Sequence, residues 1–407
     1  MTHDFSYPKG TRHHKNSIRK EEFDLKTALK PEPVSTNLIT FYQKHGFYDI
    51  MPSILNFASM TDLFPNKLRL KSNTNSNVEL SRLQIACLIS NIFLCQFLNP
   101  AHRIFKENPT NNVSKLQFEK MKFFKRYFEM LTKESFLEGS VKFHRVSVAH
   151  CPDWSSLKDK KIGPVTICLN EKIEDQNAAQ LDFCNRRIGG GVLNHGAVQE
   201  EIMFLCRPEC IASMLFTDPL DNNESLIIEG ANIFSGYSGY RSALECQPLS
   251  KSMSNVSPTI IAIDALRFKE INSLYEFQIT SIQRELNKAF AGFSMATTFN
   301  AFGNKEIATG HWGCGAFNGN KELKSIIQLL VASACDSSLI YCCFGEQKFY
   351  ESFGRVHRRL TSKNVTIADL FHWTVKYVPK KVNHKSQTKA LTLFDHIHTQ
   401  ITTVYGR

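Results

Sequence analysis

The sequence predicts an α/β protein in which helices flank a mixed sheet, with a helical region in front of that sheet. After about residue 141, short apolar runs such as VTICLN (165–170) and TIIAIDAL (259–266) alternate with helical segments. Continuous β-rich runs between helices indicate strands that are covered on both faces of a sheet. Before that point the spacing of apolar residues is helical. A chain of 407 residues with 42% hydrophobic content is large enough to bury a substantial core.

The order of these patterns divides the chain into four parts: a flexible polar tail (1–35), a helical accessory domain (36–140), an α/β domain (141–375) and a basic tail (376–407). The nearly all-round apolar stretch at 83–98 predicts a buried helix. The amphipathic run at 116–136 predicts another helix, and we expect its aromatic residues to face the core rather than a nucleic acid. Residues 246–258 are rich in Ser and Pro, which is typical of a surface loop between strands.

The cysteine pattern and the N-terminus indicate a soluble intracellular protein. None of the 12 cysteines forms a CxxC pair, and none is spaced with histidine as a zinc ligand would be. We therefore expect reduced thiols and no metal centre. The N-terminus lacks the apolar run of a signal peptide, and the apolar stretch at 85–98 is too short for a membrane span. Nuclear and cytoplasmic residence both remain open.

The net charge of +11 favours acidic partners by long-range attraction. Much of it lies in residues 346–407, which contain 11 Lys and Arg against 4 Asp and Glu. A polyanionic ligand, a nucleic acid and a plain solvated basic surface are all compatible with this surplus. Charge alone therefore decides nothing about function.

The segment GGGVLNHGAVQEE (189–201) is the strongest indication of a chemical site. Consecutive glycines let the backbone approach a ligand closely and adopt positive φ. Two carboxylates, Glu200 and Glu201, follow at the start of a predicted helix, where their directions differ by roughly 100° at about 3.6 residues per turn. A Glu-Glu pair alone is common on solvated helix faces. Together with a loop that can enclose a polar group, the pair matches what glycoside cleavage needs.

This segment resembles the signature of the poly(ADP-ribose) glycohydrolases, a triple glycine followed by a short spacer and Gln-Glu-Glu. The resemblance covers residues 40–375 in order, and it implies a macrodomain preceded by a helical accessory domain. It also includes six further segments: QIACLISNIFLCQF (84–97), LDFCNR (181–186), IIEGANIFSGYSGY (227–240), AIDAL (262–266), RELNKAFAGF (284–293) and TGHWGCGAFNG (309–319).

The resemblance implies that Glu201 is the general acid, which protonates the departing ribose hydroxyl and then accepts a proton from water. Glu200 is expected to hold the neighbouring ribose hydroxyls, with Asn185 and Asp182 fixing the sugar and the loop. For Asp182, a role as a cap or turn residue is equally open. A helix dipole favours the charged form of a first-turn carboxylate, whereas a general acid must carry a proton. Desolvation by substrate and the charges of Glu200 and the diphosphate favour the protonated form.

A second glycine-rich segment, residues 310–319, leads into another predicted helix. Backbone N–H groups at such a place form a natural cradle for a diphosphate, although the spacing fits no standard nucleotide-binding loop. Two of its residues differ from the family pattern, His311 where Asn is common and Asn318 where Gly is common. The full set of substrate-binding residues that the resemblance implies is Asn185, Gly189, Gly190, Gly191, Gln199, Glu174, Tyr237, Tyr240, Gly313, Gly315, Phe317 and Phe344.

These residues have alternative interpretations. Tyr237 and Tyr240 are expected to close over the adenosine–diphosphate part of the ligand, but they could also be exposed tyrosines of a glycine-flanked hairpin. Phe344 is expected to stack on adenine or to lie in a strand core. Glu174 is expected to read the adenine edge, with a spacing to Asp182 that is shorter than usual.

The function implied by the resemblance is hydrolysis of ribose–ribose bonds in poly(ADP-ribose), mainly from chain ends, with release of ADP-ribose. The partners would be the polymer and ADP-ribosylated proteins, in the response to DNA damage, and the enzyme would act as a monomer. No metal or cofactor is implied, because an acid and water suffice for glycoside hydrolysis. One alternative is a macrodomain that binds ADP-ribose without cleaving it, which would not need Glu201. A nucleic-acid-binding protein is the other, but the basic segment RVHRRL (355–360) is too short to support it.

Overall fold

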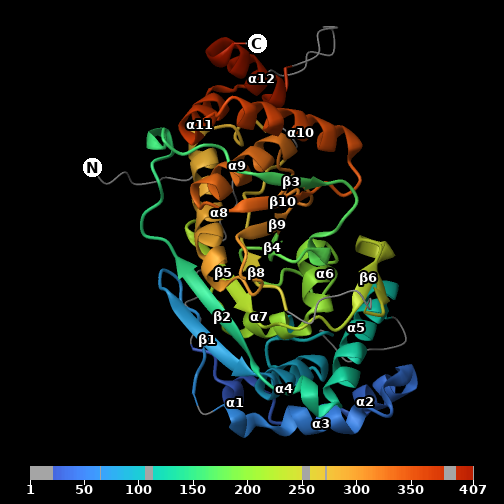
Figure 1. Cartoon of the computed structure of the whole chain (residues 1–407). Helices are drawn as coiled ribbons and strands as arrows, with labels where there is room; N and C mark the ends of the chain where they lie inside the picture. The colour runs from blue at the N-terminus through green and yellow to red at the C-terminus, as the bar shows by residue number, and fades with distance from the viewer. Residues whose placement is uncertain are drawn as a thin grey trace.

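The structure is a computed structural model, and it describes residues 22–64, 66–105, 113–249, 257–270, 273–379 and 391–406. A layer of helices lies at one end, the sheet runs through the middle, and a second group of helices covers the other end (Figure 1). The helices are α1 (Leu25–Ala28), α2 (Thr36–Tyr42), α3 (Met51–Ser59), α4 (Arg82–Phe93), α5 (Lys115–Leu131), α6 (Gln199–Cys206), α7 (Ser213–Phe216), α8 (Ile279–Phe299), α9 (Lys321–Ala334), α10 (Gln347–Ser362), α11 (Ile367–Lys376) and α12 (Leu393–Tyr405).

The central sheet has eight strands and mixed direction, which confirms the predicted α/β class. Its parallel part is β8, β4, β9, β10 and β3, while β5, β2 and β1 continue the sheet in antiparallel pairs. In spatial order the strands are β1 (Ser76–Ser81), β2 (Ser140–Ser147), β5 (Glu224–Glu229), β8 (Ile260–Ala262), β4 (Ala179–Asp182), β9 (Glu306–Thr309), β10 (Ser338–Cys342) and β3 (Val165–Cys168). A separate hairpin pairs β6 (Gly236–Ser238) with β7 (Glu245–Gln247).

The sheet separates two hydrophobic cores because successive side chains of a strand point to opposite faces. In β8, Ile260 and Ala262 belong to the core shared with the N-terminal helices, whereas Ile261 belongs to the core beneath α8 and α9. Strand β5 alternates in the same way, with Ile227 facing α8 and α9 and its two neighbours facing the N-terminal helices. Strands β8 and β4 of the parallel part are thus buried on both faces, as their continuous apolar sequence predicts, whereas the edge strand β3 is only partly covered.

Local sequence signals account for several helix starts. The side chain of Ser81 accepts a hydrogen bond from the backbone of Gln84, and the Gln84 side chain accepts one from the backbone of Ser81. Ser114 and Gln117 repeat this capping box at the start of α5. Each box satisfies two backbone N–H groups that the first turn of a helix leaves without partners.

The structure differs from the predicted division of the chain at three places: the two ends and the predicted helical domain. Residues 22–35 are not simply a tail, because Phe23 bridges Leu68 and α1 forms. Strand β1 lies inside the expected helical domain and pairs with β2. The expected basic tail contains α12, whose buried residues pack beneath α10 and α11: Leu393, Phe394, Ile397 and Ile401. Apolar spacing in this last segment drives its packing despite the charge around it.

Two further findings concern the state of the cysteines and the ability of the helices to cross a membrane. All twelve cysteines are free thiols. Among the described residues, no helix combines the length and the apolar character that a membrane crossing requires.

The topology brings several loops to one edge of the sheet. Strands β8, β4, β9 and β10 are parallel, so their carboxyl ends lie at the same edge. In α/β sheets this edge is where ligands bind. The two glycine-rich segments follow β4 and β9 there, and Phe344 follows β10.

Candidate functional site

The centre of the site is the connection between β4 and α6. Strand β4 ends at Asp182, a loop carries the glycines, and α6 begins at Gln199. The Gln199 side chain fixes the two ends of this connection, because its Oε1 accepts from the Phe183 N–H at 2.8 Å and its Nε2 donates to the Leu181 carbonyl at 3.1 Å. Both polar ends of the Gln199 amide are therefore engaged with the backbone, whereas the family resemblance implies a contact with substrate.

Glu200 is buried and held by two backbone donors. Its Oε1 accepts from the Gly189 N–H at 2.6 Å, and its Oε2 accepts from the Asn185 N–H at 2.9 Å. Burial raises the pKa of Glu200 well above its usual value, and the charges of Asp182 and Glu201 raise it further, while the two N–H donors oppose the shift. Asn185 thus contributes its backbone, and its side-chain oxygen accepts from the Arg187 N–H at 3.0 Å.

Glu201 faces the same loop from the next position of the helix. Its Oε1 accepts from the Gly191 N–H at 2.8 Å and its Oε2 from the Val198 N–H at 2.8 Å. The second contact is the backward arm of a capping box. Glu201 therefore helps to close its own helix start as well as facing the glycines. Each carboxylate oxygen accepts one N–H and keeps a further lone pair for a ligand.

The glycines leave no room for side chains beside these carboxylates. A Cβ at Gly190 would lie 2.6 Å from both Glu200 Oε2 and Glu201 Oε1. At Gly196 it would lie 2.5 Å from Glu201 Oε1, and at Gly191 it would lie 2.9 Å from the Gly196 nitrogen. Close approach to carboxylate thus requires glycine at 190 and 196, whereas the nearest atoms are the Met214 side chain at Gly189 and the Gly196 backbone at Gly191.

Asp182 lies beneath this pair and is fully buried. Within the described part of the chain neither of its carboxylate oxygens has a hydrogen-bond partner, so it acts neither as a cap nor as a turn residue. Burial raises the pKa of Asp182 well above its usual value, and the charges of Glu201 and Glu174 raise it further. Burial and repulsion between the like charges thus favour the protonated forms of Asp182 and Glu200.

The residues expected around adenine form a second group. The hydroxyl of Tyr237 lies 3.4 Å from Glu174 Oε2, and the Lys172 ammonium lies 4.1 Å from the centre of the Tyr237 ring. Burial raises the pKa of Glu174. Tyr240 is 47% exposed, at the turn after β6, so the two tyrosines differ in their surroundings. Tyr237 contacts Glu174 and Lys172, whereas the hydroxyl of the half-exposed Tyr240 accepts a hydrogen bond from the Gln199 backbone.

The segment after β9 forms a tight loop in front of α9. Trp312 is buried, and its Nε1 donates to the Ile263 carbonyl at 3.1 Å. Gly313 has φ +73° and a Cβ there would lie 2.5 Å from the Ala265 side chain, whereas Gly315 has open space around it. Phe317 is half-buried against the core under α9. This loop is shaped by packing at Gly313 and accessible at Gly315.

Phe344 packs against this loop, and Asn318 and His311 are part of it. Phe344 follows β10 with φ +52°, is 44% exposed, and would collide with a Cβ at Gly310, so it is not a core residue of the strand. Asn318 has φ +59°, a conformation that Asn tolerates better than most residues. His311 lies against Tyr341, and burial lowers its pKa to about 4. Both departures from the family pattern are thus accommodated within the fold.

One cluster could in principle hold a metal ion. Asp182, Cys184 and Glu200 each place a potential ligand atom within 4.8 Å of the others. Both Glu200 oxygens already accept backbone N–H groups, and burial raises the pKa of the Cys184 thiol well above its usual value. Both features oppose cation binding. The absence of a metal in the reaction stays a prediction.

Two cations near the site were not predicted. Arg207, at the end of α6, donates to Gln180 at 2.7 Å and its charge lowers the pKa of Asp182. Lys120 of α5 reaches the glycine loop from the helical region. Neither has a sequence signal, because a lysine of an amphipathic helix looks like any solvent-facing lysine.

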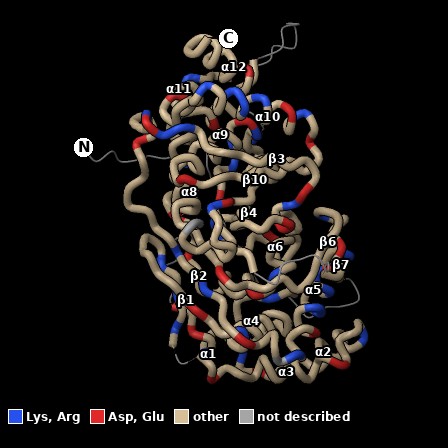
Figure 2. The backbone as a smooth tube through the Cα atoms, viewed as in Figure 1, with Lys and Arg blue, Asp and Glu red and all other residues tan. Residues whose placement is uncertain are grey.

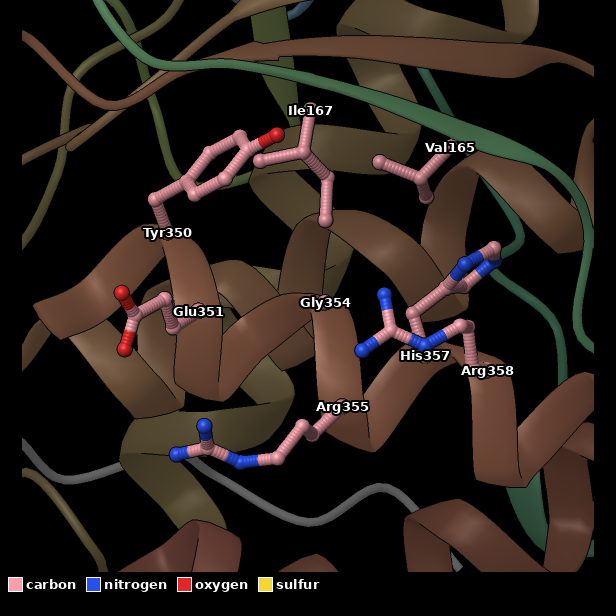
Figure 3. Close-up of a pocket in the computed structure, with 8 residues that line it drawn as sticks. All are labelled: Val165, Ile167, Tyr350, Glu351, Gly354, Arg355, His357 and Arg358. Atoms are coloured by element: carbon pink, nitrogen blue, oxygen red, sulfur yellow. The ribbon is translucent and has the colours of Figure 1, made fainter. Parts of the chain in front are cut away.

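A cavity of about 420 Å³ lies away from these carboxylates. Figure 3 shows that it is lined by β3 and α10, including Tyr350, Arg355 and Arg358. Lys and Arg positions gather along α10 (Figure 2). None of the predicted site residues lines this cavity, so it does not define the candidate site.

Two family models and several known proteins match this chain. Residues 41–145 match the helical domain of poly(ADP-ribose) glycohydrolase, and residues 151–351 match its macro domain fold. The chain is 33% identical to poly(ADP-ribose) glycohydrolase 1 of Caenorhabditis elegans over 76% of this chain and 41% of that protein. It is 28% identical to glycohydrolase 2 of the same organism, over 95% of this chain and 80% of that protein.

A plant relative and a solved structure are more distant. Poly(ADP-ribose) glycohydrolase 1 of Arabidopsis thaliana is 27% identical over 90% of this chain and 86% of that protein. The crystal structure of the enzyme from Thermomonospora curvata matches at a TM-score of 0.35 and 13% identity, covering 68% of this chain and 98% of that one. The two family domains together span most of the sequence, in the expected order. The chain belongs to the poly(ADP-ribose) glycohydrolase family.

Proposed function

We propose that this protein hydrolyses the ribose–ribose glycosidic bonds of poly(ADP-ribose), mainly from chain ends, and releases ADP-ribose. The observation that supports it most directly is the pair of buried carboxylates, Glu200 and Glu201, each held by two backbone N–H groups of the glycine-rich connection. A module that only binds its ligand has no need of two acids fixed in this way.

In the proposed mechanism, Glu201 delivers a proton to the departing ribose oxygen as the glycosidic bond breaks. The acid proton comes from a cluster of three carboxyl groups in which burial and repulsion favour the protonated forms of Asp182 and Glu200. Positive charge develops on the ribose that keeps the anomeric carbon, and Glu200 holds its hydroxyls. Water then attacks that carbon, and Glu201 takes the proton of the water. The acid is thereby restored to its starting state.

The remaining contacts place the polymer end. Glycine-rich backbone in front of α9 cradles the diphosphate, helped by the positive end of that helix. Phe317 lies beside the terminal ribose, Phe344 stacks on adenine and Tyr240 closes over the ligand. Glu174 reads the adenine edge, and Tyr237 joins Tyr240 over the adenosine–diphosphate part.

The experiment is release of free ADP-ribose from purified polymer by the wild type and by Glu201→Gln. General acid–base groups contribute about 10²- to 10⁴-fold to rate, so we expect a loss of that size. Binding of ADP-ribose, measured by calorimetry, should be retained. Glu229→Gln is the control, because it neutralises a half-buried glutamate of β5. The Glu229 carboxylate lies 2.6 Å from the His144 side chain.

The possible results separate the two classes of function. Release by the wild type and by Glu229→Gln but not by Glu201→Gln supports the hydrolase and its acid. Binding without release by any of the three proteins would make the chain an ADP-ribose reader. Unchanged release by Glu201→Gln would assign the acid to another residue.

The proposed substrate also bears on the partners of the protein. The proposed substrate accounts for the positive net charge as well as a nucleic acid would. Action as a monomer, the lack of direct nucleic-acid binding and residence in the nucleus or the cytoplasm stay predictions.

A further inference from the structure

Lys120 is a buried cation that leaves the helical region and enters the glycine loop. It lies on α5 and is 1% exposed. Its Nζ lies 2.8 Å from the carbonyl oxygens of Val192 and Asn194, 2.5 Å from that of Gly196 and 3.2 Å from that of Gly191. Four carbonyl groups of a single loop therefore converge on one ammonium group.

The backbone of the glycine loop makes hydrogen bonds on two sides. Its carbonyl groups face Lys120, while the N–H groups of Gly189 and Gly191 face the carboxylates of α6. Gly191 takes part in both sets, because its N–H donates to Glu201 and its carbonyl accepts from Lys120. The backbone of this glycine thus connects the ammonium group to the proposed general acid.

Burying the Lys120 ammonium costs free energy, and its contacts with the glycine loop offset that cost. Burial lowers the pKa of Lys120 to about 8, and the charge of Glu201 partly opposes this shift. Within the described residues Lys120 has no carboxylate within ion-pair distance, so the four carbonyl dipoles and the more distant charge of Glu201 offset its desolvation. Without the ammonium, the carbonyl oxygens of Val192, Asn194 and Gly196 would lose this donor, which costs free energy at partly buried groups. The Gly191 carbonyl would still accept from the N–H groups of Asn194 and Gly196.

Helix α5 also holds the tyrosine hairpin. Glu119, the neighbour of Lys120, accepts from the Cys246 N–H of β7 at 3.3 Å. In Figure 1, α5 lies next to α6 and to the hairpin that contains β6. One helix of the N-terminal region therefore contacts both the glycine loop and the hairpin that carries Tyr237.

From these contacts we infer that Lys120 is a positioning residue for the cleavage step: it clamps the glycine loop so that the Gly191 N–H holds Glu201 in place. This inference rests on the proposed function. It gives the helical region a part in positioning the acid, because the ammonium that contacts this loop comes from α5.

The first test is Lys120→Met, which keeps an unbranched apolar side chain and removes the cation. A displacement of about 1 Å can cost about 100-fold in rate, so we expect kcat to fall about 100-fold. KM for the polymer and Kd for ADP-ribose should change less than about threefold, because the phosphate and adenine contacts are separate. All assays are run well below the melting temperature of each variant.

Three further variants make the result specific. Lys122→Met is the control, since Lys122 lies on the same helix, is solvent-exposed and pairs with Glu119 at 2.6 Å. We expect its kcat to equal that of the wild type. Lys120→Gln, which keeps amide donors, serves if Lys120→Met does not fold, and we expect an intermediate loss. The double variant Lys120→Met/Glu201→Gln should be no slower than Glu201→Gln alone, because both changes disable one acid.

The outcomes are distinct from those of the proposed function. An active wild type with an equally active Lys120→Met or Lys120→Gln variant would overturn this inference and leave the hydrolase intact. Fully additive losses in the double variant would also overturn it, because Lys120 would then act independently of Glu201. A wild type that releases no ADP-ribose would remove the proposed function itself.

Discussion

At the scale of single residues, glycine decides where the two carboxylates can lie. The triple glycine predicts close approach of backbone to a ligand, and the structure shows close approach to the protein's own acids. Gly190 has φ +48° and packs against both glutamate side chains. The glycines are therefore required before any substrate arrives.

Gly190→Ala should impair turnover more than folding. A Cβ would displace the ends of Glu200 and Glu201, which are flexible but held by hydrogen bonds, so we expect turnover to fall about 100-fold. The left-handed φ should cost roughly 1–2 kcal/mol of unfolding free energy. Polymer cleavage and urea unfolding measure the two effects.

Gly303→Ala is the matched control for this change. Gly303 has φ +67°, and a Cβ added there would have nothing within 4 Å, so it carries the backbone strain without the collision. It should lose a similar unfolding free energy and keep full turnover. Equal activity of the two variants would show that the carboxylates do not depend on Gly190.

At the scale of elements, the two glycine-rich loops differ in how they are held. The first depends on side chains of α6 and α5. The second depends on packing under α9, where Trp312 and Lys324 lie together with the Lys324 ammonium 4.4 Å from the centre of the indole ring. His311 belongs to this second loop, and its imidazole is buried in the neutral form at neutral pH because its pKa is lowered to about 4.

His311→Asn should make the fold less sensitive to acid. The unfolded histidine titrates near 6.5 and the folded one near 4, so the unfolded state binds the proton first as pH falls. The contribution of His311 to the unfolding free energy is therefore fully present above pH 6.5, and it is lost as the pH falls from 6.5 to 4. The loss amounts to roughly 3 kcal/mol at 1.36 kcal/mol per pKa unit.

Urea unfolding at pH 7 and pH 4 tests this prediction. The difference in unfolding free energy between the two pH values should be smaller for His311→Asn than for the wild type. His150→Asn, a change at an exposed histidine, should behave as the wild type does. A pH dependence that is unaltered by His311→Asn would mean that the buried ring is not the group responsible.

At the scale of the whole molecule, the two family domains share the central sheet and one of its two hydrophobic cores. Strands β1 and β2 come from the N-terminal part of the chain and extend the macrodomain sheet at β5. Arg145 of β2 is fully buried where the parts meet. Its guanidinium donates to the Leu70 carbonyl at 3.2 Å, to the Asp218 carbonyl at 2.6 Å, and to Glu224.

Arg145→Met should destabilise both parts together. Removing one partner of a buried ion pair leaves an uncompensated charge, which costs about 3–5 kcal/mol. We expect urea unfolding to remain a single transition at a lower midpoint. The double variant Arg145→Met/Glu224→Gln should recover part of the loss, because Glu224 then carries no charge. Two separate transitions in the single variant would indicate that the parts are independent.

Several features were predictable from the sequence because their signals are local. Apolar periodicity gives the alternation of strands and helices, and the glycine run followed by Glu200 and Glu201 marks the loop and the helix start. Positions that the sequence left open were settled by contacts. Asp182 makes no cap, Phe344 leaves the strand core, and Gln199 binds backbone on both sides.

By itself, the sequence determined the class of fold, the order of its elements and the segment that carries the acids, since these depend on residues close together in the chain. Only the tertiary structure decided that Lys120 supports that segment, across separations of 71–76 residues. It also decided that β1 completes the sheet and that α12 packs onto the core. The physical reason is that a long cationic side chain and an edge strand carry no local sequence pattern that predicts their place. The residues that bury them lie elsewhere in the chain.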